Sequence, residues 1–182
     1  MLEIAAGFLL GIVASVSVWY VLEHLLVPRV EFLPAIYRSK TQENPSGYKY
    51  RVKFRNIGRR EILDFELFAK LRLRGVSSTA NWRAVYIPID DSRIPRIPSH
   101  RKSGKRLAVQ LLVSEIPDHA AAFLPSELKS ARDNGSLTLE NLMAFGNEGT
   151  LEIVGFGYDA FSGTRKVFQS KVYGVGQLED ES

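Results

Sequence analysis

Cysteine is absent from the 182-residue chain, and histidine occurs only three times. Without cysteine there can be no disulfide framework and no thiolate metal site, and His24, His100 and His119 lack the spacing of a zinc site. The sequence also has no Walker loop, nucleophile elbow or dinucleotide fingerprint. Carboxylate pairs such as Asp90-Asp91 fit ordinary turn chemistry. We therefore expect no enzymatic activity, no metal and no cofactor.

Charge, proline, asparagine, aspartate and glutamine are missing from one long stretch, Ile4 to Leu22. A helix of this length reaches roughly 28 Å, close to the hydrocarbon thickness of a bilayer. Trp19 and Tyr20 stand near its end, where aromatic rings favour the headgroup level. A cleaved signal peptide would need a basic start and a small-x-small cleavage site, and a buried core helix rarely stays uncharged for so long. The stretch therefore predicts a transmembrane helix.

Positive charge follows this stretch rather than preceding it, at Arg29, Arg38 and Lys40. Lysine and arginine are enriched on the cytoplasmic side of membrane helices. The pattern predicts a single-pass protein of the inner cell membrane, with its N-terminus outside and the following domain in the cytoplasm. The lack of cysteine agrees with a reducing compartment.

Small residues repeat every four positions on one face of this predicted helix, at Gly7, Gly11 and Ser15, with Ala14 beside them. Such small-xxx-small spacing lets helix backbones approach closely, although glycine and alanine are common in membrane helices generally. We expect these four residues to support a homo-oligomer. The pattern does not specify the number of copies.

The formal net charge is +4, despite an acidic end at Glu179-Asp180-Glu181. Basic surfaces bind anionic lipid or nucleic acid, and a membrane anchor makes lipid the simpler partner. The cations concentrate in the predicted loop Asp90–Arg106, which could equally be a solvated loop. The candidate anion- or lipid-binding residues are Arg29, Arg38, Lys40, Arg93, Arg96, Arg101, Lys102, Lys105 and Arg106.

Alternation of apolar and polar residues predicts a mainly β domain. It is clearest over Tyr48–Asn56, where Lys49, Arg51, Lys53 and Arg55 share one face. A first extended segment, interrupted at Pro34, precedes this strand. Further strands are expected over Ile62–Leu73, Trp82–Ile89, Leu107–Val113, Leu151–Tyr158 and Thr164–Tyr173, and short helices over Ser126–Arg132 (capped by Ser126) and Ser136–Phe145 (capped by Thr138).

These elements predict an all-β, immunoglobulin-like β-sandwich with short helical insertions, preceded by one N-terminal transmembrane helix. The expected division is 1–27 as the transmembrane helix, 28–47 as a linker and first strand, 48–174 as the β-sandwich, and 175–182 as a loosely ordered acidic tail.

Parts of the chain resemble the cytoplasmic domain of inward-rectifier potassium channels. The likeness lies in Val52–Asn56 leading into Ile62–Leu67, in the turn Pro88–Ser92, and in the hairpin from Leu151 to Tyr173. It implies an immunoglobulin-like sandwich, four-fold assembly and basic residues near a membrane. The family's pore helix and selectivity filter have no counterpart, so potassium conduction is not implied. The filter-like string Val154–Asp159 is interpreted as a strand in which Gly155 and Gly157 mark close packing or a bulge.

The resulting functional hypothesis is a single-pass, membrane-anchored, self-associating β-sandwich module. It would bind a protein partner or an anionic ligand at the cytoplasmic face. The alternative is an oligomeric pore-forming or channel-like membrane effector, for which Ser15 and Ser17 offer the only polar lining in the helix.

Overall fold

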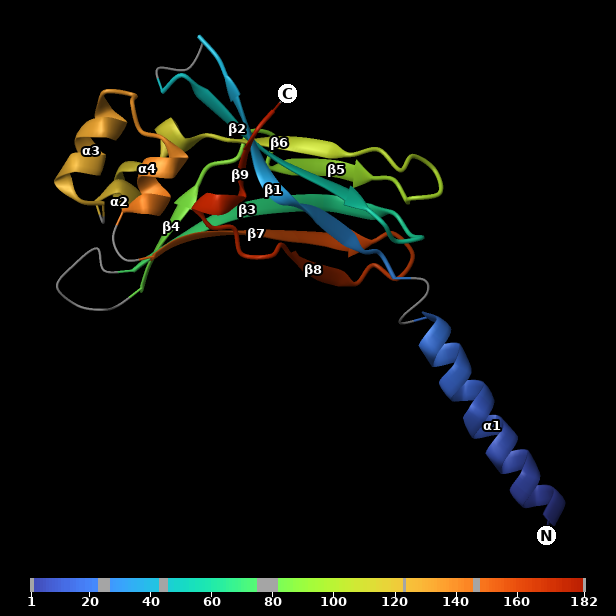
Figure 1. The fold of residues 1–182 in the computed structure, drawn as a ribbon. Helices are drawn as coiled ribbons and strands as arrows, with labels where there is room; N and C mark the ends of the chain where they lie inside the picture. Colours follow the sequence, from blue (N-terminus) through green and yellow to red (C-terminus); the bar gives the residue numbers. More distant parts are fainter. Residues whose placement is uncertain are drawn as a thin grey trace.

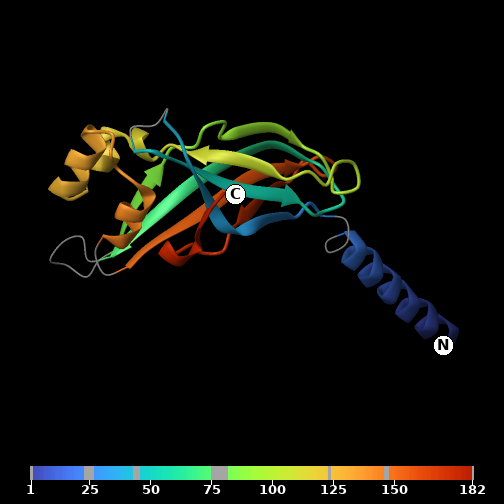
Figure 2. The same cartoon turned by 45° about the horizontal axis from the view of Figure 1, so that its top comes forward.

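The computed structural model describes residues 2–22, 27–42, 46–74, 82–122, 124–145 and 148–181. Within these residues the strands form two facing sheets (Figure 1). Helix α1 (Leu2–Tyr20) projects from one end of the sheets, and the short helices α2 (Asp118–Ala121), α3 (Ser126–Asp133) and α4 (Leu139–Ala144) gather at the other end (Figure 2).

The first sheet has the order β6-β2-β1-β9. Its strands are β1 (Val30–Lys40), β2 (Tyr48–Asn56), β6 (Leu107–Leu111) and β9 (Leu178–Asp180). β2 has the bounds that its alternation predicted. β1 runs unbroken through Pro34, and its register against β2 shifts between Phe32 and Ile36. Proline has no N–H to donate to the ladder, so the irregularity falls where the sequence predicted a break.

The C-terminal residues form part of this sheet. β9 pairs in parallel with β1, with Leu178 opposite Ile36 and Asp180 opposite Arg38. The short 3₁₀ turn η3 (Val175–Gln177) leads into it. The expectation of a loosely ordered acidic tail is therefore wrong. The carboxylates of this segment bind cations on β1 and β2, which sequence spacing alone does not bring together.

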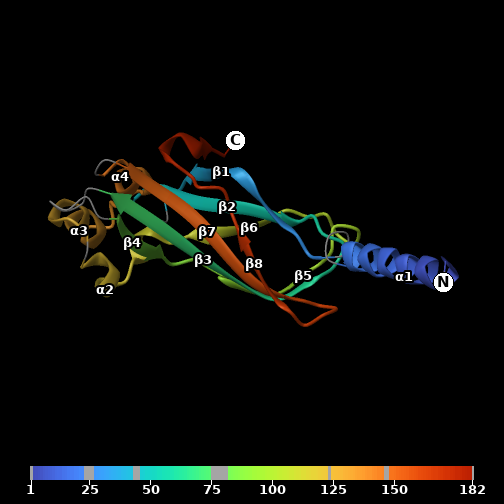
Figure 3. The same ribbon diagram turned by 90° about the horizontal axis from the view of Figure 1, so that it is seen from below.

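The second sheet has the order β4-β3-β7-β8, with β5 also paired to β3. Its strands are β3 (Ile62–Arg74), β4 (Trp82–Ile87), β5 (Arg93–Ile97), β7 (Glu148–Asp159) and β8 (Arg165–Gln169). β3 and β7 lie side by side along their length (Figure 3), from Ile62 opposite Asp159 to Arg74 opposite Glu148. β5 lies inside the segment that was predicted as one long loop. A strand forms there because Ile94 and Ile97 supply apolar side chains that pack on the core.

The core lies between the sheets. Phe54 of the first sheet and Phe65 of the second are both buried, with ring centroids 5.6 Å apart. Thr138 caps α4 as predicted, because its hydroxyl accepts a hydrogen bond from the N–H of Asn141. Ser126 does not cap α3, since Pro125 occupies the N-cap position.

Two predictions about architecture are wrong. Among the described residues, no helix combines the length and the apolar character that crossing a membrane requires. α1 begins at Leu2 and ends at Tyr20, and residues 21–22 continue as a π turn. The predicted transmembrane helix and the predicted inner-membrane location with its orientation are therefore wrong.

The immunoglobulin-like sandwich behind that helix is also incorrect. Immunoglobulin-type sandwiches consist of antiparallel sheets. Here the parallel β1–β9 pairing closes one sheet, and β5 joins β3 on the other. The structure is a mainly β, two-sheet protein with short helices.

Two glycines on β7 let β3 approach closely, which confirms the interpretation of Gly155 and Gly157 as close-packing positions. A Cβ added at Gly155 would lie 2.4 Å from Cζ of Phe65, and one at Gly157 would lie 2.4 Å from Cγ2 of Ile62. The register between β3 and β7 also shifts here, between Leu63 and Glu66.

Replacing Gly155 with alanine should destabilise the domain, because the new methyl group must displace the buried ring of Phe65. We expect a loss of about 1–3 kcal/mol in the free energy of unfolding, measured by denaturant titration. Gly176→Ala is the matched control, since nothing lies within 4 Å of a Cβ at that position. Equal stability of the two variants would contradict this packing account.

Candidate functional site

Several segments converge at the end of the sheets from which α1 leaves. The N–H groups of Ile57 and Gly58 donate to the carbonyl oxygen of Arg29, and the N–H of His100 donates to that of Gly58. The N–H of Ala160 donates to the carbonyl oxygen of Glu61. These bonds hold together residues 27–29, 57–61, 98–106 and 160–164, which we call the basic end.

A buried carboxylate organises part of the basic end. Asp159 is 1% exposed and accepts hydrogen bonds from Nη1 of Arg60 at 2.8 Å, Oγ of Ser162 at 2.9 Å and the N–H of Phe161 at 3.1 Å. Burial raises the pKa of Asp159, but the Phe161 N–H, Arg60 and Ser162 together bring this pKa below its ordinary value. The guanidinium of Arg60 also stacks 4.3 Å from the ring centre of Phe161.

Four of the predicted anion-binding cations are paired with carboxylates of this chain. Arg93 bonds Asp64 through two nitrogens, at 2.5 and 3.0 Å. Lys102 and Arg96 both bind Glu61, at 2.7 and 2.6 Å, and hold the pKa of Glu61 below its ordinary value. The fourth paired cation is Arg38, which lies elsewhere.

Arg38 and Lys40 are far from the basic end. They stand at the opposite end of β1 from Arg29, roughly 30 Å away at about 3.3 Å per residue. Arg38 bridges Asp180 at 2.5 Å and Glu140 at 2.6 Å, and Glu140 also accepts a hydrogen bond from the hydroxyl of Tyr50. Burial, and then that bond to Glu140, raise the pKa of Tyr50. This cluster fastens α4 and β9 to the first sheet.

The cation stripe of β2 is likewise occupied. Lys53 and Arg51 bind Glu181 at 2.6 and 2.9 Å, and Arg55 binds Glu31 at 2.5 Å. The ammonium of Lys53 also lies 4.1 Å from the ring centre of Tyr37. Three of the four cations of the stripe are therefore paired, with one carboxylate from the C-terminal segment and one from β1.

Three of the remaining predicted cations form a smaller group at the basic end. In the part of the chain that the structure describes, Arg101, Lys105 and Arg106 are exposed and have no carboxylate partner. Arg59, in the neighbouring turn, has the same properties and was missed by the sequence prediction. The paired arginines Arg59-Arg60 were the only signal for it. We call Arg59, Arg101, Lys105 and Arg106 the unpaired basic cluster.

The predicted self-association residues lie on a helix whose surface is uncovered. From Ile4 to Leu22 every residue is exposed, including Phe8 at 70% and Leu10 at 70%. A Cβ at Gly7 or Gly11 would meet nothing within 4 Å. The hydroxyls of Ser15 and Ser17 donate to carbonyl oxygens of their own helix, those of Gly11 and Val13, so the outer surface stays apolar.

Within the described ranges, no group of three or more histidine, cysteine, aspartate or glutamate side chains could hold a metal ion. His24 lies outside the described residues, while His100 sits in the loop before β6 and His119 in α2. What the arrangement offers chemically is apolar and cationic contact surface.

Comparisons with known proteins give little more. No family model and no curated protein matches the chain. Among solved structures, it is similar to the crystal structure of Spo0M, a sporulation control protein from Bacillus subtilis, with 11% identity and a TM-score of 0.36 over 85% of this chain and 49% of that chain. This similarity is too distant to carry an argument about function.

The resemblance to inward-rectifier potassium channels is wrong, because no family model matches the chain and its sheets depart from the antiparallel, immunoglobulin-like sandwich that the resemblance implied. The segments that carried it are a strand end, a turn and a hairpin. Their amino-acid patterns follow from the alternation of apolar and polar residues in strands and from the residue preferences of turns, which many β proteins share.

Removing the carboxylate of Asp159 should destabilise the protein. Asp159→Asn leaves Arg60 and Ser162 facing an amide, and we expect a loss of roughly 2–3 kcal/mol at pH 7 by denaturant titration. The pKa of Asp159 is lower in the folded than in the unfolded protein, so the carboxylate contributes its full stabilisation only above its ordinary pKa of about 4. The difference in unfolding free energy between wild type and Asp159→Asn should therefore shrink as the pH falls below that value. Asp64→Asn is the control, since its partner Arg93 is 71% exposed and the change should be much smaller. Similar losses in both variants would contradict this assignment.

Proposed function

We propose that the chain is a non-enzymatic binding module that self-associates through α1 and binds a phosphate-bearing anionic ligand at the unpaired basic cluster. The observation that carries the proposal is the uncovered apolar surface of α1. This helix extends from the domain at the basic end (Figure 1).

The exposure of α1 supports self-association. Burying a side chain such as Leu, Ile, Val or Phe contributes about 1.5–3 kcal/mol, so a helix with many such side chains in water is strongly driven to be covered. The two sheets of the same chain do not cover it. A second copy of α1 supplies matching apolar surface, and Gly7 and Gly11 leave room for its backbone to approach.

The charge distribution supports an anionic ligand. Ten of the other lysines and arginines form ion pairs with carboxylates of the same chain, which reduces their attraction for an external anion. Arg59, Arg101, Lys105 and Arg106 lie on two adjacent loops and offer several exposed donors. Arginine matches phosphate oxygens with two parallel N–H donors, and lysine adds a point charge.

Enlarging the small face of α1 should weaken self-association. Gly7→Ile with Gly11→Ile fills open space in a single copy, so reduced assembly would report on contact between copies. We expect a lower oligomeric mass at equal concentration in analytical ultracentrifugation. Val13→Ile with Val16→Ile is the control, because at about 100° per residue these positions face the opposite side. Unchanged mass in the glycine variant would exclude this face as the seam.

Removing the unpaired cations should weaken binding of a polyphosphate. We expect Arg101→Gln with Lys105→Gln and Arg106→Gln to reduce the affinity for inorganic tripolyphosphate by at least about tenfold, measured by calorimetry, because charge-assisted hydrogen bonds are lost. The affinity of the wild type should also fall with added salt.

The matched control for this experiment removes the same charge elsewhere. This control combines Lys40→Gln, Lys129→Gln and Lys171→Gln. The three lysines lie away from the basic end, farther than the screening length of about 8 Å at physiological salt. The affinity of this variant should stay close to that of the wild type. Equal weakening in both triple variants would show that net charge, rather than this cluster, governs binding.

A further inference from the structure

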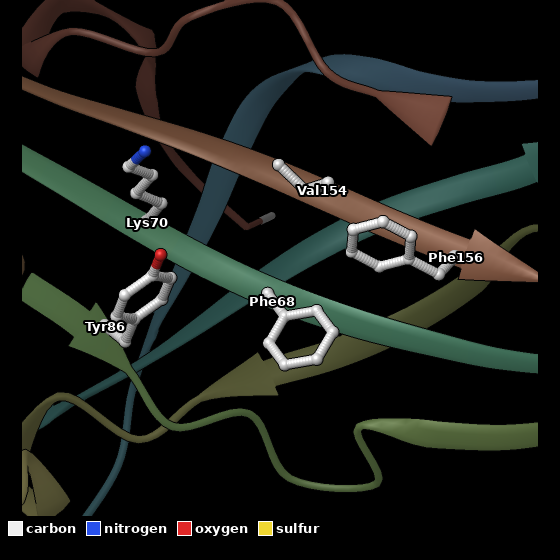
Figure 4. Close-up of a pocket in the computed structure, with 5 residues that line it drawn as sticks. All are labelled: Phe68, Lys70, Tyr86, Val154 and Phe156. Carbon is white, nitrogen blue, oxygen red and sulfur yellow. The ribbon is translucent and has the colours of Figure 1, made fainter. Parts of the chain in front are cut away.

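The outer face of the second sheet carries an apolar groove that none of the roles above uses. It is lined by Phe68 and Lys70 of β3, Tyr86 of β4, and Val154 and Phe156 of β7, and its volume is about 490 Å³ (Figure 4). This volume lies in the range of small-molecule sites, which extends from about 300 to 1,000 Å³. Phe68 is 38% exposed and Tyr86 is 55% exposed, so the groove is open to ligand.

One end of the groove is aromatic. The rings of Phe68 and Phe156 meet edge to face, with centroids 5.7 Å apart and planes at 79°. Val154 stands directly opposite Phe68 on the neighbouring strand. Val167 of β8, opposite Phe156 and 57% exposed, extends the apolar surface. This end presents hydrocarbon and the ring of Phe68 to a ligand, while the guanidinium of Arg165 lies 4.8 Å from the ring centre of Phe156.

The other end is polar and cationic. Lys70 and Tyr86 are direct cross-strand partners, and the ammonium group and the phenolic hydroxyl lie on the same side of the groove (Figure 4). Glu152 is the carboxylate opposite Lys70, but Glu152 binds Nη2 of Arg72 at 3.3 Å. Within the described part of the chain, Lys70 has no carboxylate partner of its own.

We propose that this groove binds a small amphiphilic carboxylate, with its apolar or aromatic body on Phe68, Val154 and Phe156 and its carboxylate at Lys70 and Tyr86. An apolar floor with a few convergent polar groups is the usual composition of a small-molecule site. The ammonium selects a negative head group, and the Tyr86 hydroxyl adds a hydrogen-bond donor. A neutral ligand would leave the charge of Lys70 without a partner, and a cationic ligand would be repelled.

The test compares 4-phenylbutyrate with its neutral analogue 4-phenylbutanol, using backbone NMR shifts of the full chain. We expect 4-phenylbutyrate to shift the amides of the groove and 4-phenylbutanol to bind more weakly there. Lys70→Met keeps the apolar stem and removes the charge, so it should weaken 4-phenylbutyrate by about tenfold and leave 4-phenylbutanol unchanged. Lys129→Met, on α3, is the control and should bind both compounds as the wild type does.

Two results would overturn the proposal. One is the absence of groove shifts for 4-phenylbutyrate up to millimolar concentration. The other is equal weakening of both compounds by Lys70→Met, which would show that the ammonium selects no charge. Lys70→Arg guards against a folding defect, because it keeps the positive charge and should retain the preference for the carboxylate. Failure at this groove leaves the behaviour of α1 and of the basic cluster unaffected.

Discussion

The close approach of β3 to β7 at Gly155 is the contact on which the second sheet depends. With no side chain there, the ring of Phe65 lies against the backbone of β7 and fills the space between the sheets. This contact fixes the register of the two longest strands, and in a strand a one-residue slip would exchange the buried and exposed faces. The same register places Phe68 beside Val154 and Lys70 beside Glu152 on the outer face. The strand register that packs the core therefore also sets which side chains line the groove on the outer face.

Charge in this protein is distributed by pairing across long sequence separations. The bond between Arg38 and Asp180 joins residues 142 positions apart, and Glu181 forms ion pairs with two cations of β2. The parallel addition of β9 makes these pairs possible. The C-terminal segment supplies carboxylates to the first sheet, whereas Arg59, Arg101, Lys105 and Arg106 on the loops of the basic end have no carboxylate partner within the described residues.

Local properties of the fold could be predicted from the sequence. The alternation of β2, the Thr138 cap and the role of Gly155 each depend on neighbours a few residues away or on a property of one residue type. β5 and β9 could not be predicted in this way, because each is short and owes its order to a strand distant in sequence. The candidate anion site was overestimated for the same reason: Arg38, Arg93, Arg96 and Lys102 have carboxylate partners that no local pattern reveals. The predicted transmembrane helix rested on the composition of Ile4 to Leu22, and no described helix meets the requirements for crossing a membrane.

The two apolar surfaces of the protein differ in what they can select. From Ile4 to Val18 the surface of α1 is apolar, because the hydroxyls of Ser15 and Ser17 donate to backbone carbonyls of the same helix, so this part offers contact area without a polar group that would fix a partner's orientation. Such a surface suits a like partner, whose small residues set the distance of approach. The groove is smaller, but Lys70 and Tyr86 stand at one end of it, so a ligand must present opposite chemistry at its two ends. The large apolar area of α1 favours association between copies. The polar and apolar ends of the groove favour selection of a small ligand, so the two surfaces have separate roles.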